Sequence, residues 1–123
     1  MRITVDCGKP RYTMRGGIGA SWHAIEAGQR HGAGSAWGGN PPHHAEDRWR
    51  ELYGFADWLG MNWLRVEIEQ LMYEPQRGQF TFDSPAMQSL YRILDWCESR
   101  GAHVMLQQMW ANVEWNRHPD VDA

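Results

Sequence analysis

The sequence predicts an α/β fold in which parallel strands alternate with helices, as in the first units of a (β/α)8 barrel. Twice, a helical pattern ends at a glycine that is followed at once by a strand pattern, in residues 60–67 and 101–108. The two junctions lie about forty residues apart, the length of one strand-helix unit of such a barrel. A complete barrel takes roughly 250 residues. The chain has 123 residues, so we expect an N-terminal hairpin and the first three units of a barrel that is incomplete in this chain.

The N-terminal part is predicted to hold a hairpin and the first strand. Ile3 and Val5 alternate with polar residues ahead of a turn, which indicates a β-hairpin over residues 1–15. Residues 16–43 begin with a glycine-rich strand that ends near His23 and continue as a long loop rich in glycine.

Two amphipathic helices are predicted, over residues 44–60 and 85–100. Their apolar residues recur at steps of three and four, Ser84 is a suitable N-cap for the second helix, and Gly60 is a typical residue after the end of the first. The apolar stripes are Ala45, Trp49, Leu52, Ala56 and Leu59 in the first helix and Met87, Leu90, Leu94 and Cys97 in the second. The tryptophans inside the helical patterns are predicted to fill the core, namely Trp49, Trp58 and Trp96.

The strand predicted at 61–70 separates apolar from polar side chains. One parity is Leu64, Val66 and Ile68, and the other is Trp63, Arg65, Glu67 and Glu69. A parallel strand flanked by helices is normally apolar on both faces, so we expect the charged parity to face a polar region such as the barrel lumen near the carboxyl ends of the strands. An edge strand with one face in water is the alternative. In the strand predicted at 102–110, apolar and polar residues are mixed on both parities, so the sequence does not show which of its faces points inward.

Four further tryptophans lie at predicted strand ends or in polar loops, namely Trp22, Trp37, Trp110 and Trp115. A flat apolar ring edged by polar groups is a surface on which a sugar ring stacks. The stretch after the third strand adds Asn112 and Glu114 beside two of these rings. These residues predict a carbohydrate-binding rim.

A longer pattern lies between the second strand and the second helix, where the sequence reads Glu-Pro-x-x-Gly-x-Phe-x-Phe from Glu74 to Phe82. This pattern resembles the (β/α)8-barrel glycoside hydrolases of clan A, in particular their β-galactosidase, β-xylosidase, xylanase and cellulase-like branches. Residues 62–66 resemble the second strand of that clan, in which an arginine near the strand end hydrogen-bonds the catalytic carboxylates.

The resemblance implies retaining hydrolysis of O-glycosidic bonds, in which one carboxyl group is the acid and base and a second is the nucleophile. It implies that Arg65 orients these carboxylates and that Trp22 and His23 bind substrate at the end of the first strand. The residues of the rim are predicted to bind substrate with them, namely Trp37, Gln108, Trp110, Asn112 and Trp115. Glu67 and Glu69 are expected to pair with Arg65 or to bind substrate hydroxyl groups. The resemblance places the acid and base after an asparagine at the end of the fourth strand and the nucleophile at the end of the seventh, both outside this chain. Asn112 and Glu114 have the wrong spacing for that Asn-Glu pair.

Composition argues against several other classes of protein. The net charge is -3, with 12 Lys+Arg against 15 Asp+Glu, so the basic stripe of a nucleic-acid-binding protein is missing. No apolar run approaches the roughly 20 residues of a membrane helix, and no signal peptide is recognisable at the start. Cys7 and Cys97 are isolated, which favours reduced thiols and a cytoplasmic protein, with a secreted protein as the alternative.

No metal or cofactor is predicted. His43 and His44 are adjacent, which is not the spacing of metal ligands, and they are interpreted as the solvated start of a helix. The glycines at 16–19 and 32–34 lack the strand-then-helix context of a phosphate-binding loop.

Two other functions remain open at this point. The chain could form a self-contained α/β module that binds a carbohydrate or a protein without turnover, or an interaction domain anchored by exposed tryptophans. For the enzyme we expect the remaining barrel strands on the same longer chain or on complementing chains, because a sheet of three parallel strands leaves both edges unpaired. The isolated chain is then expected to be aggregation-prone and catalytically silent.

Overall fold

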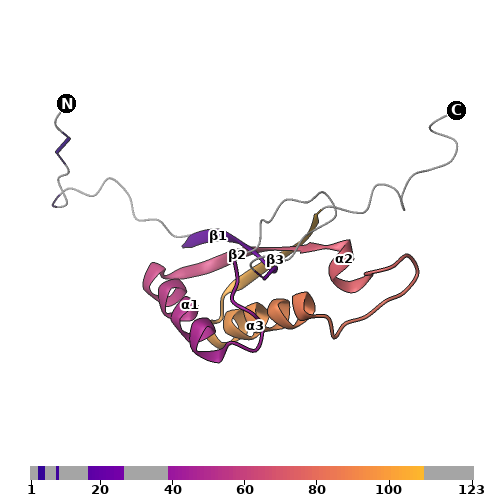
Figure 1. The fold of residues 1–123 in the computed structure, drawn as a ribbon. Helices are drawn as coiled ribbons and strands as arrows, with labels where there is room; N and C mark the ends of the chain where they lie inside the picture. The colour runs from indigo at the N-terminus through magenta and orange to yellow at the C-terminus, as the bar shows by residue number, and fades with distance from the viewer. Residues whose placement is uncertain (1–2, 5–7, 9–16, 27–38, 110–123) are drawn as a thin grey trace, which may run out of the picture.

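The computed structural model describes residues 3–4, 8, 17–26 and 39–109, and it shows a mixed α/β arrangement (Figure 1). A parallel sheet in the order β1-β2-β3 carries helices α1 and α3 on one face. The elements are β1 (Ile18–His23), α1 (Glu46–Leu59), β2 (Met61–Glu69), α2 (Gln70–Tyr73), α3 (Pro85–Arg100) and β3 (His103–Met109). The predicted alternation of parallel strands and helices is confirmed. Most of the hairpin predicted at 1–15 lies outside the described residues.

The helix ends were predicted from residue types whose backbone preferences are strong. Gly60 and Gly101 follow α1 and α3 in the left-handed conformation, with φ of 65° and 62°, which costs little only without a Cβ. Ser84 caps α3, since its hydroxyl accepts a hydrogen bond from the Met87 N–H at 3.2 Å, and Pro85 occupies the first turn. These local signals place both long helices within two residues of their predicted bounds.

One element was not predicted, the single turn α2 directly after β2. The Glu69 N–H donates to the Met72 sulfur at 3.2 Å at its start. At its end the Glu74 carboxylate accepts hydrogen bonds from the Gly78 N–H at 2.7 Å and from the Gln70 side-chain amide at 2.6 Å. The Gly78 N–H holds the pKa of Glu74 below its usual value. In this chain, Glu74 and Gly78 of the Glu-Pro-x-x-Gly pattern therefore close a turn.

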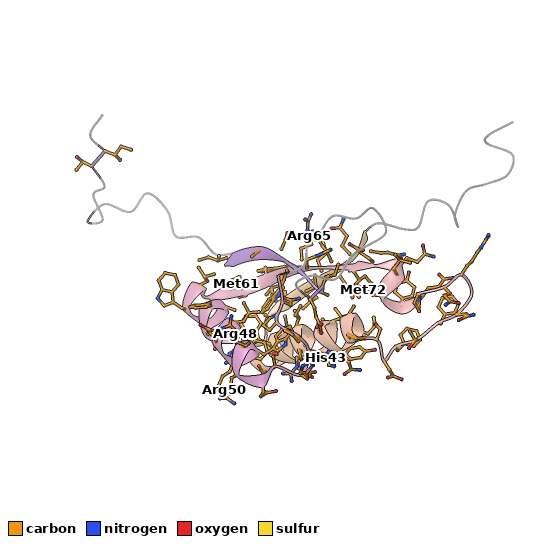
Figure 2. The ribbon with its side chains drawn as sticks, viewed as in Figure 1. His43, Arg48, Arg50, Met61, Arg65 and Met72 are labelled. Carbon is orange, nitrogen blue, oxygen red and sulfur yellow. The ribbon has the colours of Figure 1, made fainter. Side chains whose placement is uncertain are left out.

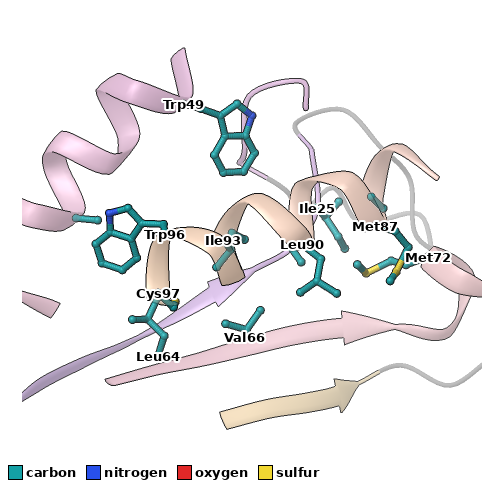
Figure 3. Packing of buried hydrophobic residues seen from close by; sticks show 13 residues of the cluster. Ile25, Trp49, Leu64, Val66, Met72, Met87, Leu90, Ile93, Trp96 and Cys97 are labelled. Carbon is teal, nitrogen blue, oxygen red and sulfur yellow. The ribbon is translucent and has the colours of Figure 1, made fainter. Parts of the chain in front are cut away.

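The core lies between β2 and the two long helices (Figure 3). Val66, Trp49 and Ile93 are completely buried, and Leu64 is almost so. The Trp49 indole N–H donates to the Pro42 carbonyl at 3.0 Å, so the largest core side chain also satisfies its polar atom. This packing turns the apolar parity of β2 toward the helices, as predicted.

Trp58 corrects the prediction that the tryptophans of the helices fill the core. Its side chain is 84% exposed, whereas Trp49 is fully buried and Trp96 is 4% exposed. Trp58 follows Trp49 by nine residues, about two and a half helical turns, so the two rings lie on opposite sides of α1. Leu59, placed in the apolar stripe, is also half exposed.

The sheet order overturns the alternative interpretation of β2. It is the central strand, with β1 and β3 paired along its two edges, and not an edge strand. Its charged parity is therefore not explained by an unpaired edge. Figure 2 shows Arg65 on the side of the sheet away from the helices.

Replacing each tryptophan of α1 by phenylalanine tests this arrangement. Trp49→Phe is expected to lower the free energy of unfolding by about 1–3 kcal/mol, because it removes the indole hydrogen bond to the Pro42 carbonyl and leaves a void in the core. Trp58→Phe, the matched control on the same helix, is expected to change it by less than about 0.5 kcal/mol. Urea unfolding followed by circular dichroism measures both, and equal losses would contradict the assigned faces.

Candidate functional site

Polar side chains of all three strands share the face of the sheet that α1 and α3 do not cover. The register pairs Ser21 with Arg65, His23 with Glu67, and Glu67 with Gln107. Side chains of paired residues in parallel strands lie on the same face. We call this surface the Arg65 face; it comprises Ser21, His23, Trp63, Arg65, Glu67, Glu69, His103, Met105 and Gln107.

Arg65 joins two strands on this face. Its Nε–H donates to the Ser21 hydroxyl of β1 at 3.1 Å, and its terminal nitrogen contacts a carboxylate oxygen of Glu67. The Arg65 side chain remains 45% exposed, whereas the Glu67 side chain is only 13% exposed. Arg65 therefore holds one carboxylate and keeps donors free to reach a second anion or a hydroxyl group.

Glu69 has a different partner from Glu67. Its Oε1 lies 3.3 Å from Nε2 of His23, and the two side chains are 3% and 13% exposed. Glu67 and Glu69 thus belong to separate pairs, one with an arginine and one with a histidine. Two neighbouring pairs of ionisable side chains therefore lie toward the carboxyl ends of β1 and β2.

Burial and the negative charge of Glu67 shift the pKa values of Glu69 and His23. Burial raises the pKa of Glu69 to about 7, and the nearby negative charge of Glu67 adds to the rise. Burial lowers the pKa of His23, and Glu67 partly opposes that shift. Near neutral pH, Glu69 therefore exists partly as a neutral acid beside a neutral imidazole.

A shallow hollow lies farther along the same face, toward the amino ends of the strands. Its volume is about 500 Å³, and it is lined by Gly19, Ala20, Ser21, Trp63, Leu64, Arg65 and Met105. The Trp63 ring lies 4.4 Å from the His103 ring, centroid to centroid. The hollow is thus lined by Trp63, whose ring contacts His103, and by Arg65.

Two of the predicted substrate-binding residues lie on the opposite face. Trp22 is paired with Val66, its ring is 5.6 Å from that of Trp96, and its indole N–H donates to Asn40 at 2.9 Å. Gln108 is paired with Ile68 and donates to the Tyr73 hydroxyl at 2.7 Å. These contacts with the helix side separate both residues from Arg65, which corrects their predicted place in the site.

The remaining predicted residues divide into two groups. His23, Arg65, Glu67 and Glu69 are brought together by the register of β1 and β2. Trp37, Trp110, Asn112 and Trp115 lie outside the described residues, so their predicted contact with substrate stays a prediction.

Five residues of the Arg65 face were not predicted as site residues, namely Ser21, Trp63, His103, Met105 and Gln107. Ser21 has the same parity as His23 on β1, and that alternation was the available signal. Gln107 is the neighbour of Glu67, whereas Gln108 had been predicted; the mixed parities of β3 carried no signal for this choice.

A second buried carboxylate, Glu26, links segments on the helix side. Its Oε1 accepts from the His43 N–H at 2.6 Å, lies 2.8 Å from His43 Nδ1, and accepts from the buried Ser89 hydroxyl at 3.3 Å. His43, whose side chain is 32% exposed, is therefore held by Glu26, whereas His44 is exposed as predicted for the start of a solvated helix. Glu26 ties the segment before α1 to β1 and α3.

Within the described ranges, no three His, Cys, Asp or Glu side chains are grouped so as to hold a metal ion. In the same part of the chain, none of the helices combines the length and apolar character needed to cross a bilayer.

Comparisons with protein-family models, with curated proteins and with solved structures gave no significant match to this chain.

Titration of Glu69 makes the free energy of unfolding depend on pH. Because its pKa in the folded protein, about 7, lies above the usual 4.5, the folded state binds more protons between these values, and stability falls as the pH rises through this window. Glu69→Gln is expected to reduce that fall by about 1–3 kcal/mol.

Thermal or urea unfolding at about pH 5 and pH 8 measures the effect. Glu51→Gln on α1 is the matched control, because the Glu51 side chain is 54% exposed. A fall in stability that is the same in wild type and Glu69→Gln would contradict the shifted pKa.

Proposed function

We propose that the Arg65 face is part of the active site of a glycoside hydrolase, in which this chain binds the sugar and orients a catalytic carboxylate. The observation that carries the proposal is the joining of Arg65 to Ser21 and Glu67 where β1 and β2 approach their carboxyl ends. Ligands of parallel α/β folds bind at that end of the strands.

The groups on this face suit a polyhydroxylic ligand. Arg65 supplies donors, Glu67 supplies an acceptor, and Glu69 is an acid near neutral pH. Trp63, 48% exposed, adds a flat apolar ring. Hydroxyl groups of a sugar both donate and accept hydrogen bonds. A site with donors, acceptors and an aromatic ring therefore suits a sugar better than it suits a purely anionic ligand.

The proposed enzyme is a (β/α)8 barrel in which further strands pair with the outer edges of β1 and β3. Parallel sheets are almost always covered on both faces, and among the described residues no strand pairs with either edge. Residues of those further strands then supply the proton donor and the nucleophile, and Arg65 hydrogen-bonds one of the two carboxylates. The reaction is hydrolysis with retention, which needs two carboxyl groups about 5–5.5 Å apart.

Aryl glycosides test this proposal. We assay release of the phenol by the chain alone and by the chain supplied with strands that complete its sheet, on the same polypeptide or a second one. Arg65→Ala is expected to lower kcat/KM by about tenfold or more, because a catalytic carboxylate loses its charged hydrogen-bond donor.

Arg50→Ala is the matched control, since Arg50 forms an exposed ion pair with Asp47 on α1. Unchanged turnover in Arg65→Ala would remove Arg65 from the mechanism. Saccharide binding at the Arg65 face without any turnover would favour a carbohydrate-binding module instead.

A further inference from the structure

Helix α1 has two flanks along the sheet, and α3 lies on one of them. On that side Glu46 forms an ion pair with Arg92 at 2.6 Å. About three turns further along α1, Asp57 forms a second ion pair with Arg100 at 2.7 Å. Figure 1 shows the two helices side by side on the same face of the sheet. The flank of α1 toward α3 is therefore occupied.

The other flank of α1 carries exposed apolar side chains. Phe55 is 59% exposed, Trp58 is 84% exposed and Leu59 is 50% exposed. Phe55 and Leu59 each lie two residues from Asp57, a rotation of about 200° around the helix, so they point away from α3. We call Phe55, Trp58 and Leu59 the outer flank of α1.

The spacing on this side of the helix is that of a contact between two helices. Leu52, which is partly buried against the core, is followed at steps of three and four by Phe55 and Leu59. Apolar residues at these steps line up along one side of a helix and interdigitate with the side chains of a neighbouring helix. A helix side that stays in water normally carries polar residues instead. The spacing therefore favours a helix as the occupant of this flank.

The sheet is uncovered on the same side. Ala20 of β1 is the register partner of Leu64, so both lie on the face that carries the helices. Leu64 is 1% exposed, whereas Ala20 is exposed. Because α3 packs on β2 and β3, α1 lies on the β1 side of α3. The gap in the layer of helices is therefore next to the outer flank of α1.

The area of the outer flank argues against a second copy of this chain as the occupant. From their exposed fractions, the three side chains can still lose about 400 Å² of accessible surface. A stable dimer buries about 800 Å² on each partner. The flank suits a helix that is also held to the sheet through its own strand.

We propose that the outer flank of α1 is the docking surface for an amphipathic helix, whose strand pairs with the outer edge of β1. This inference rests on the proposed function in taking further strands to complete the sheet, and it names the surface by which their helices join this chain. Its test measures accessibility and not turnover, so the two proposals fail separately.

Cysteine labelling at position 55 tests the proposal. Phe55→Cys is expected to fold, because Phe55 is exposed. Its reaction with a maleimide is measured in the full chain alone and in the chain joined to strand-helix units that complete its sheet. In the completed protein the rate is expected to fall about tenfold or more, because the reagent then reaches the covered flank only on local opening. The wild-type chain, which has Cys7 and Cys97, gives the background rate.

Phe80→Cys is the matched control, since Phe80 is 63% exposed and lies in the loop before α3. Its rate is expected to be the same in both forms. Equal rates at position 55 in the two forms would overturn the docking proposal. So would protection of position 55 that appears with rising concentration of the chain alone, because a second copy would then be the occupant. Protection without glycoside turnover would support the docking surface and count against the hydrolase.

Discussion

The contact between β2 and α3 is the constraint on which the other features depend. Leu64 and Val66 of β2 are buried against a helix side that includes Ile93 and Cys97, and a strand that commits one parity in this way must turn the other parity outward. Arg65 and Glu67 are thereby placed together on the far face. A shift of one residue in the register of β2 would bury the charges and expose the apolar side chains.

The site therefore follows from the strand that forms the core. β1 contributes Ser21 and His23 at positions that the register aligns with Arg65 and Glu67. Gly19 makes close pairing with β2 feasible, because a Cβ there would lie 3.1 Å from the Trp63 carbonyl oxygen. The small residues of β1 allow close pairing with β2. This pairing brings the polar side chains of the two strands together.

Features that depend on a few neighbouring residues could be predicted from the sequence. Features that depend on contacts between residues distant in sequence could not. Gly60 and Ser84 marked helix ends because their preferences are local, and the strict alternation of β2 marked its two faces. Trp22 lies on the helix side because Trp96 and Asn40 contact it there, which its neighbours in sequence do not reveal. The pairing of Glu69 with His23, and not with Arg65, likewise needs the register of two strands.

The turn closed by Glu74 and Gly78 separates the loop before α3 into a stem and a tip. The stem is held by the Thr81 N–H, which donates to the Tyr73 carbonyl at 2.8 Å, and by the Ser84 hydroxyl, which donates to the Met72 carbonyl at 2.6 Å. Phe80 at the tip is 63% exposed. An engineer could replace this turn while the two hydrogen bonds of the stem keep β2 and α3 in place, so the loop could be varied without rebuilding the sheet.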